Sequence, residues 1–270
     1  MIYIIGSIIV LVGTVFLFYY FKPQKKERIE SIYTNALNAM IRGDSRTALT
    51  HLRDVVKQDT DHIDAYLQMG NILRGENNPL AAKKIHQSLM VRPNLSKQIL
   101  LDIHMALALD FELLGDLVKA QNEAELVLNI DKKNLWANEF LLSLFEKQKN
   151  WDKAAVISKT VQRIKQHKDP HQIAKFLVFQ GMDKINKSQE SEALSIFNKA
   201  IKIAPDYGLS YLRLGDYYSD KRDLTRAIEN WEKFAIYDPQ DSYKVYSKIE
   251  SALFDLGRFS EVEKFYERIL

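Results

Sequence analysis

The sequence predicts an all-α protein in which one N-terminal transmembrane helix precedes a solenoid of helix-turn-helix repeats. Two observations predict this fold: an uncharged apolar run opens the chain, and a pattern of small, aromatic and proline residues then returns about every 34 residues. The chain has 270 residues, of which 46% are hydrophobic and 27% charged, which is the balance of an ordered protein. We expect an anchor over residues 1–22, a basic juxtamembrane linker over 23–28 and the repeat solenoid over 29–270.

The anchor is predicted from the run Ile2–Phe21, which carries no charge and, as a helix of about 20 residues, matches the hydrocarbon core of a bilayer. No basic residue precedes the run and bulky aromatic residues end it, which disfavours a cleaved signal peptide. Lys22, Lys25, Lys26 and Arg28 follow at once, so the positive-inside rule predicts a single-pass protein with its repeats in the cytoplasm.

Two glycines of the anchor, Gly6 and Gly13, lie seven residues apart and therefore share one helix face. Such a face allows another transmembrane helix to approach closely, and we expect Gly6 and Gly13 to be candidates for this packing. The alternative is that both glycines face lipid.

The repeat is clearest over residues 208–241, which match the tetratricopeptide (TPR) pattern at Tyr211, Leu214, Gly215, Tyr218, Ala227, Trp231, Phe234 and Pro239. The same frame predicts about seven units, which begin near Ile29, Ile63, Leu101, Leu135, Ala174, Gly208 and Tyr243. Small residues should mark the places where the two helices of a unit cross, as at Gly70, Gly215, Ala82 and Ala227.

Two of the unit spacings are longer than the rest, at 38 residues from Ile63 to Leu101 and 39 from Leu135 to Ala174. Pro93 and Pro170 fall in these stretches, and a proline ends a preceding helix. We therefore expect longer turns between units here, and the second turn predicts a hinge near residues 165–173.

Composition and motifs argue against catalysis. The chain has no cysteine and a formal net charge of only +3, which excludes thiolate chemistry and disfavours a nucleic-acid surface. His167 and His171 are four apart, but Pro170 between them breaks the helix that would align them on a metal. No HExxH, GxGxxG, P-loop or GxSxG motif occurs. The sequence predicts no enzyme, no cofactor and no metal site.

A protein-binding surface is the remaining prediction, because stacked TPR units form a groove lined by first-helix side chains. Phe179 and Met182 are the expected apolar anchors, with partial burial against the next repeat as the alternative. The repeat frame predicts a lining of Gln68, Asn71, Arg74, Met105, Asp110, Glu139, Phe140, Phe179, Met182, Arg213 and Asp216.

One span is more specific than the general TPR pattern. Ala65–Ala120 carries Gly70 and Asn71, then Leu73 and Arg74, and the segment IHQSLM over residues 85–90. With the anchor, this span resembles the lipopolysaccharide assembly protein B family of bacterial inner-membrane TPR proteins. The resemblance implies a cytoplasm-facing adaptor that regulates lipopolysaccharide synthesis together with a membrane AAA+ protease and lipid A biosynthesis enzymes.

Two alternatives remain open at this point. A membrane-anchored TPR scaffold of another complex, for secretion, pilus or respiratory assembly, fits the same repeats. The family also ends in a rubredoxin-like metal module with two cysteine pairs, and the sequence up to Leu270 has none. We expect either a truncated form or a divergent relative that lacks the module.

Overall fold

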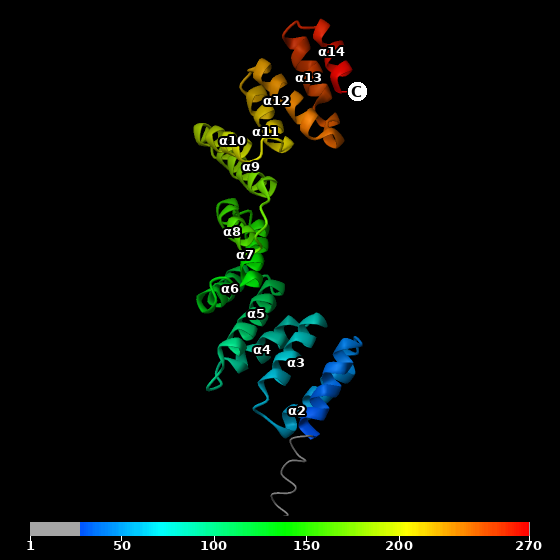
Figure 1. Ribbon diagram of the computed structural model, residues 1–270, viewed down its shortest axis with the longest axis vertical. Helices are drawn as coiled ribbons and strands as arrows, with labels where there is room; N and C mark the ends of the chain where they lie inside the picture. The colour runs from blue at the N-terminus through cyan, green and yellow to red at the C-terminus, as the bar shows by residue number, and fades with distance from the viewer. Residues whose placement is uncertain (1–27, 270) are drawn as a thin grey trace, which may run out of the picture. The chain divides into compact units, whose positions relative to one another are not determined.

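The computed structural model describes residues 28–269, and every regular element within them is a helix (Figure 1). The all-α prediction is therefore confirmed for this part of the chain. No helix within residues 28–269 is both long and apolar enough to cross a membrane. The predicted anchor over residues 1–22, with Gly6 and Gly13, and nearly all of the predicted linker over 23–28 lie outside the described residues and stay predictions.

The chain divides into two compact units, the first ending at Lys132 and the second starting at Lys133. In unit 1 a helix over residues 28–41 packs on α2, and two further pairs follow. The helices of unit 1 are α2 (Ser45–Gln58), α3 (Ile63–Gly75), α4 (Pro79–Leu89), α5 (Lys97–Leu113) and α6 (Leu117–Ile130).

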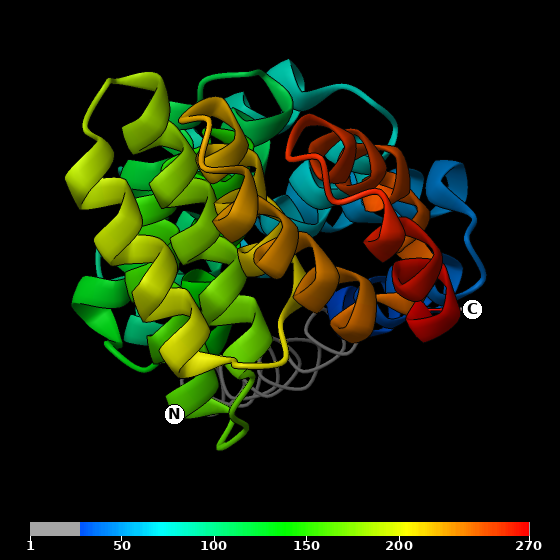
Figure 2. The same ribbon diagram turned by 90° about the horizontal axis from the view of Figure 1, so that it is seen from above.

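Unit 2 contains four helix pairs among its described residues, and their course can be followed from green to red in Figure 2. Each first helix packs on the second helix that follows it. The helices are α7 (Leu135–Lys147), α8 (Trp151–Ile164), α9 (Pro170–Asn186), α10 (Glu190–Ile203), α11 (Gly208–Asp220), α12 (Leu224–Tyr237), α13 (Tyr243–Asp255) and α14 (Ser260–Ile269), with a short 3₁₀ helix, η1 (Pro239–Asp241), before α13.

The turn inside each pair has a common geometry. One residue adopts a positive φ, which glycine tolerates best, and in most pairs the next residue is the N-cap of the second helix. In most repeats that next residue is Asp or Asn, whose side chain accepts the amide hydrogen of the residue three positions later. The positive-φ residues of these turns are Gly43, Asn77, Gly115, Lys149, Ser188, Arg222 and Gly257.

Helix starts confirm the repeat frame at α3, α7, α11 and α13 and correct it at two places. The repeats expected near Leu101 and Ala174 begin earlier, at Lys97 and Pro170. Their first helices α5 and α9 have 17 residues each, whereas α3 has 13. Most of the extra residues in each of the two long repeat spacings therefore form an additional helical turn. Pro170 starts α9 because proline fits the first helical position, where its missing N–H costs nothing.

The predicted hinge near residues 165–173 spans the short α8–α9 connection. The buried Gln162 amide nitrogen donates to the Asp169 carbonyl oxygen at 2.9 Å, and the Asp169 amide donates back to Gln162 Oε1 at 3.0 Å. Asp169 also caps α9 by accepting from the Gln172 amide at 3.0 Å. These bonds hold the α8–α9 connection in place. The predicted hinge motion about this connection stays a prediction.

Small residues lie where the two helices of a repeat cross, as the sequence predicts. A Cβ added to Gly70 would lie 2.2 Å from the His86 ring, and the same atom at Gly215 would lie 2.4 Å from the Trp231 ring. Gly181 stands in the same relation to Phe197. A large ring on the second helix thus fills the space left by a glycine on the first, and the prediction that Gly70 and Gly215 mark crossings is confirmed.

Candidate protein-binding surface

First helices of consecutive repeats lie next to one another within each unit, α3 beside α5 in unit 1 and α9 beside α11 in unit 2. Ion pairs join such neighbours. Lys175 of α9 reaches Glu146 of α7 at 3.2 Å, and Lys248 of α13 reaches Asp216 of α11 at 2.6 Å. The half-exposed polar side chains of these first helices form the candidate surface of each unit.

In unit 1 the structure brings together four of the predicted lining residues. Asn71 donates from its side-chain amide to Gln68 Oε1 at 3.4 Å and accepts from Arg74 Nη2 at 2.8 Å. Arg74 also donates from Nη1 to Asp110 Oδ1 at 3.1 Å and to the Ala106 carbonyl oxygen at 3.3 Å. This chain of bonds fixes the Arg74 guanidinium between two repeats. Met105 is half-buried on α5.

Asp110 is a correction to the predicted lining, because its side chain is fully buried and does not reach an open surface. Its second carboxylate oxygen pairs with His86 Nδ1 at 2.5 Å, and His86 is also fully buried. His86 Nε2 lies 3.3 Å from the Leu67 carbonyl oxygen. Sequence reasoning missed this pair. The available signal was that His86 occupies the position filled by Phe197 and Trp231 in later repeats.

Phe140 is a second correction. Its side chain is buried, with 9% of the residue exposed, and its ring stacks on Trp136 with centroids 5.0 Å apart. Phe140 therefore belongs to the packing of α7. The neighbouring Glu139 is half-exposed, as a surface residue should be, and pairs with Lys165 at 2.5 Å.

Phe179 and Met182 are both half-buried. The Phe179 ring lies 4.7 Å from the Trp151 ring of α8, and Met182 packs against the core cluster that includes Phe197. Each side chain thus has a packing partner and an exposed part. Partial burial, which the sequence offers as the alternative to a role as apolar anchors, is observed for both residues. Their role in binding stays a prediction.

A pocket of about 550 Å³ lies between α11, α12 and α13 and is lined mainly by polar and charged residues. Asp216 Oδ1 accepts from Trp231 Nε1 at 3.1 Å and from Lys248 Nζ at 2.6 Å, and Asp216 Oδ2 accepts from Arg213 Nη1 at 3.3 Å. Two exposed carboxylates, of Asp220 and Asp255, also line it. We call this the α11–α13 pocket. The Lys248 ammonium and the Asp220 and Asp255 carboxylates can hydrogen-bond to a peptide, and the pocket contains the predicted residue Asp216.

No group of three or more His, Cys, Asp or Glu side chains within residues 28–269 could hold a metal ion. His171 Nε2 bonds Asp206 Oδ1 at 2.8 Å on an exposed surface. That hydrogen bond is the main cause that lowers the pKa of Asp206 below its ordinary value. His167 is exposed in the connection before α9.

Successive antiparallel helix pairs with a glycine opposite a large ring, and a row of half-exposed polar side chains on the first helices, define a TPR scaffold. No family model matches the chain. The chain is similar to the curated lipopolysaccharide assembly protein B of Escherichia coli strain K12, with 19% identity over 92% of this chain and 64% of that protein. For the protein of the same name from Haemophilus influenzae the identity is 22% over 87% of this chain and 61% of that protein.

These matches confirm the resemblance to the lipopolysaccharide assembly protein B family, which extends over most of the chain. The chain spans somewhat less than two thirds of the length of these curated relatives, 64% and 61%.

Two of the solved structures that match the chain are TPR proteins, at low identity. The crystal structure of YrrB, a TPR protein with an unusual peptide-binding site, has 17% identity, covers 69% of this chain and 95% of its own, and has a TM-score of 0.48. A TPR protein from Parabacteroides merdae has 16% identity, covers 90% of this chain and 98% of its own, and also has a TM-score of 0.48.

Proposed function

We propose that this chain is an adaptor of the bacterial inner membrane whose repeats bind proteins on the cytoplasmic side. In this proposal residues 2–21 hold the repeats at the membrane, and partner binding regulates lipopolysaccharide synthesis together with a membrane AAA+ protease and lipid A biosynthesis enzymes. The resemblance to lipopolysaccharide assembly protein B over about nine tenths of the chain supports the pathway. The uncharged run followed by basic residues supports the topology.

The α11–α13 pocket is the observation that carries the protein-binding part of the proposal. Its Asp216 carboxylate is held by Trp231, Lys248 and Arg213, so the group is positioned before a partner arrives. A preorganised site binds more tightly because less conformational entropy is lost on binding. Peptide backbones offer donors and acceptors that suit such a polar pocket.

Proximity labelling from the intact anchored protein, read by mass spectrometry, tests this function. We expect a membrane protease and lipid A enzymes to be labelled. Reversing the charge of both exposed carboxylates with Asp220→Arg and Asp255→Arg should remove partners that depend on the pocket, with little change in folding because both side chains are exposed.

Glu229→Arg with Glu263→Arg is the matched control, because these exposed carboxylates lie on the second helices α12 and α14 of the same repeats. The control should keep every labelled partner. Labelling of secretion, pilus or respiratory assembly components in place of lipid A enzymes would replace the proposed pathway by the alternative complex. Equal loss in both double variants would contradict a role for the pocket.

A further inference from the structure

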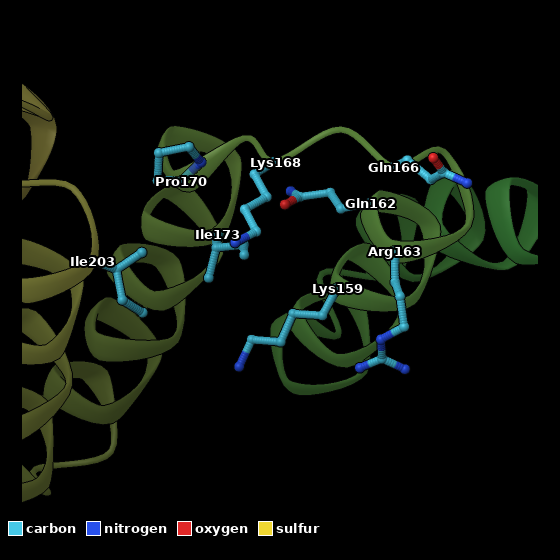
Figure 3. Close-up of a pocket in the computed structure, with 8 residues that line it drawn as sticks. All are labelled: Lys159, Gln162, Arg163, Gln166, Lys168, Pro170, Ile173 and Ile203. Carbon is cyan, nitrogen blue, oxygen red and sulfur yellow. The ribbon is translucent and has the colours of Figure 1, made fainter.

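A second pocket, of about 580 Å³, lies in unit 2 between α8, α9 and the end of α10 (Figure 3). Three cationic side chains, of Lys159, Arg163 and Lys168, border it, and none of the residues that line it is acidic. Figure 3 shows Lys159 and Arg163 on α8 at one side and apolar side chains at the other. We call it the α8–α9 pocket; it shares no lining residue with the α11–α13 pocket.

The apolar side of the α8–α9 pocket comes from the extra turn of α9. Pro170 and Ile173 belong to the turn by which α9 starts earlier than the repeat frame predicts, and Ile203 of α10 completes the wall. Ile173 and Ile203 are only half-buried, although both pack against a core cluster. The extra helical turn of α9, which α5 also has and α3 lacks, thus makes one wall of the pocket.

The pocket is fixed in shape where the chain enters α9. Gln162 exchanges two hydrogen bonds with the backbone of Asp169 and also reaches Gln172 Oε1 at 3.2 Å. These bonds hold the residue that follows Lys168. The wall that carries this lysine is therefore ordered without a ligand, which favours binding because less entropy is lost.

The cations of the pocket have no anionic partner in the described part of the chain. Lys159 and Arg163 stand four apart on α8, so their side chains are neighbours, and like charges at this spacing destabilise a helix. Other cations near them are paired, such as Lys165 with Glu139 and Lys175 with Glu146. Unpaired like charges beside an apolar wall are complementary to an anionic ligand with an apolar part.

We propose that the α8–α9 pocket docks an acidic segment of a partner protein, with carboxylates on Lys159 and Arg163 and one apolar side chain against Ile173 and Ile203. A volume of about 580 Å³ suits a few side chains. The apolar wall consists of three residues, which is too short for an acyl chain and favours a peptide over a lipid. The proposal rests on the proposed function only in taking the occupant to be a protein.

Fluorescence anisotropy with the full chain in zwitterionic nanodiscs tests the pocket. The probe is a fluorescein-labelled peptide of sequence Asp-Glu-Leu-Asp-Glu with neutral ends. Lys159→Glu with Arg163→Glu should raise its Kd at least about tenfold, because two attractive contacts become repulsive. Replacing the acids of the probe by Asn and Gln, or its Leu by Ser, should weaken binding in the parent protein.

The matched control is Arg53→Glu with Lys57→Glu, since these exposed cations stand four apart on the second helix α2 and give the same change of net charge. The control should stay within about twofold of the parent Kd, because its charges lie outside the pocket. Circular dichroism melts of both double variants should match the parent. Equal weakening in both variants, or no preference for the acidic probe, would overturn the proposal.

Monomeric dihexanoyl phosphatidylglycerol distinguishes a lipid from a peptide. If this phospholipid binds the parent chain, loses binding in the Lys159→Glu and Arg163→Glu variant, and the peptide does not bind, then the pocket takes lipid and the proposal is wrong. The Asp220→Arg and Asp255→Arg variant should bind the peptide as the parent does. A failure here leaves the proximity-labelling result for the α11–α13 pocket unaffected, so the two proposals fail separately.

Discussion

The imidazole of His86 occupies a place that an apolar ring fills in later repeats. Phe197 and Trp231 stand opposite Gly181 and Gly215 as His86 stands opposite Gly70. A buried imidazole needs partners, because an unsatisfied buried polar group costs free energy. The Asp110 carboxylate supplies one partner to His86.

Removing that carboxylate should be costly. Asp110→Ala leaves the buried His86 ring and the Arg74 guanidinium without their anion, so we expect the free energy of unfolding to fall by about 3 kcal/mol. Urea denaturation followed by circular dichroism measures the loss. The control is Asp61→Ala, which breaks an exposed pair with Arg92 and should cost under about 1 kcal/mol. Similar losses in both variants would contradict a stabilising role for the buried pair.

The crossing glycine gives a second prediction at this scale. Gly70→Ala places a methyl group 2.2 Å from the His86 ring, so the ring or a helix must shift, and we expect a loss of about 1–3 kcal/mol. Gly75→Ala in the same helix meets nothing within 4 Å and should be neutral or slightly stabilising, because alanine favours helices. Thermal melts compare the two, and a stable Gly70→Ala variant would show that the crossing can open.

At the scale of elements, three second helices begin at an aspartate cap: Asp44, Asp116 and Asp223. The pKa of each lies below its ordinary value, chiefly through a side-chain hydrogen bond with the residue three positions later and then through the backbone amide of that residue. A carboxyl with a lowered pKa stabilises the fold above its unfolded pKa. This stability is lost as the pH falls through the folded pKa.

Acid should therefore lower the melting temperature partly through these caps. Replacing Asp44, Asp116 and Asp223 by Asn keeps a capping side chain but removes the titrating group. We expect the melting temperature of the triple variant to fall less steeply between about pH 5 and pH 3 than that of the parent. Calorimetry over this range measures the slope. An unchanged slope would mean that other carboxyl groups cause the acid sensitivity.

The repeat frame could be predicted because the spacing of glycine, alanine and aromatic residues is set by how two helices pack. It places the starts of α3, α7, α11 and α13 at Ile63, Leu135, Gly208 and Tyr243, as observed. The frame fails at Pro170, because a proline that predicts the end of one helix also suits the start of the next.

The polar features could be predicted less well. Asp110 looks like a surface residue in the sequence, because its burial depends on His86, 24 positions away. The α8–α9 pocket depends on the extra turn of α9 and on the placement of three separate helices. Residue types and the repeat period predict neither the burial of Asp110 nor this pocket, because both depend on contacts between residues far apart in the sequence.

At the scale of the molecule, all three tryptophans, Trp136, Trp151 and Trp231, lie in unit 2. Tryptophan fluorescence therefore reports on unit 2, while circular dichroism reports on helices of both units. Stacked repeats contact mainly their neighbours, so damage in one place need not unfold the rest. Asp110→Ala should lower the midpoint of the first circular dichroism phase and leave the fluorescence midpoint within about 1 °C. An equal shift of both signals would show that the units unfold together.

The topology is the last prediction. If residues 2–21 cross the membrane with the basic residues inside, a protease added to intact spheroplasts should spare the repeats, and lysis should expose them. Immunoblotting with an antibody against residues 133–269 reads the result, with a periplasmic protein as the control for access. Digestion of the repeats in intact spheroplasts would overturn the orientation and, with it, the cytoplasmic partners of the proposed function.

The bond between His86 of α4 and Asp110 of α5 joins two successive repeats. Repeat arrays commonly evolve by duplication and loss of whole units, which is harmless when each unit buries only apolar groups against the next. Here a duplication or deletion of repeats with its boundary between residues 90 and 96 would separate the His86 imidazole from the Asp110 carboxylate. Each group would then be buried in an apolar interior without its partner. We therefore expect the second and third repeats to be inherited together and in fixed order. Repeats joined only by apolar contacts can be exchanged without this cost.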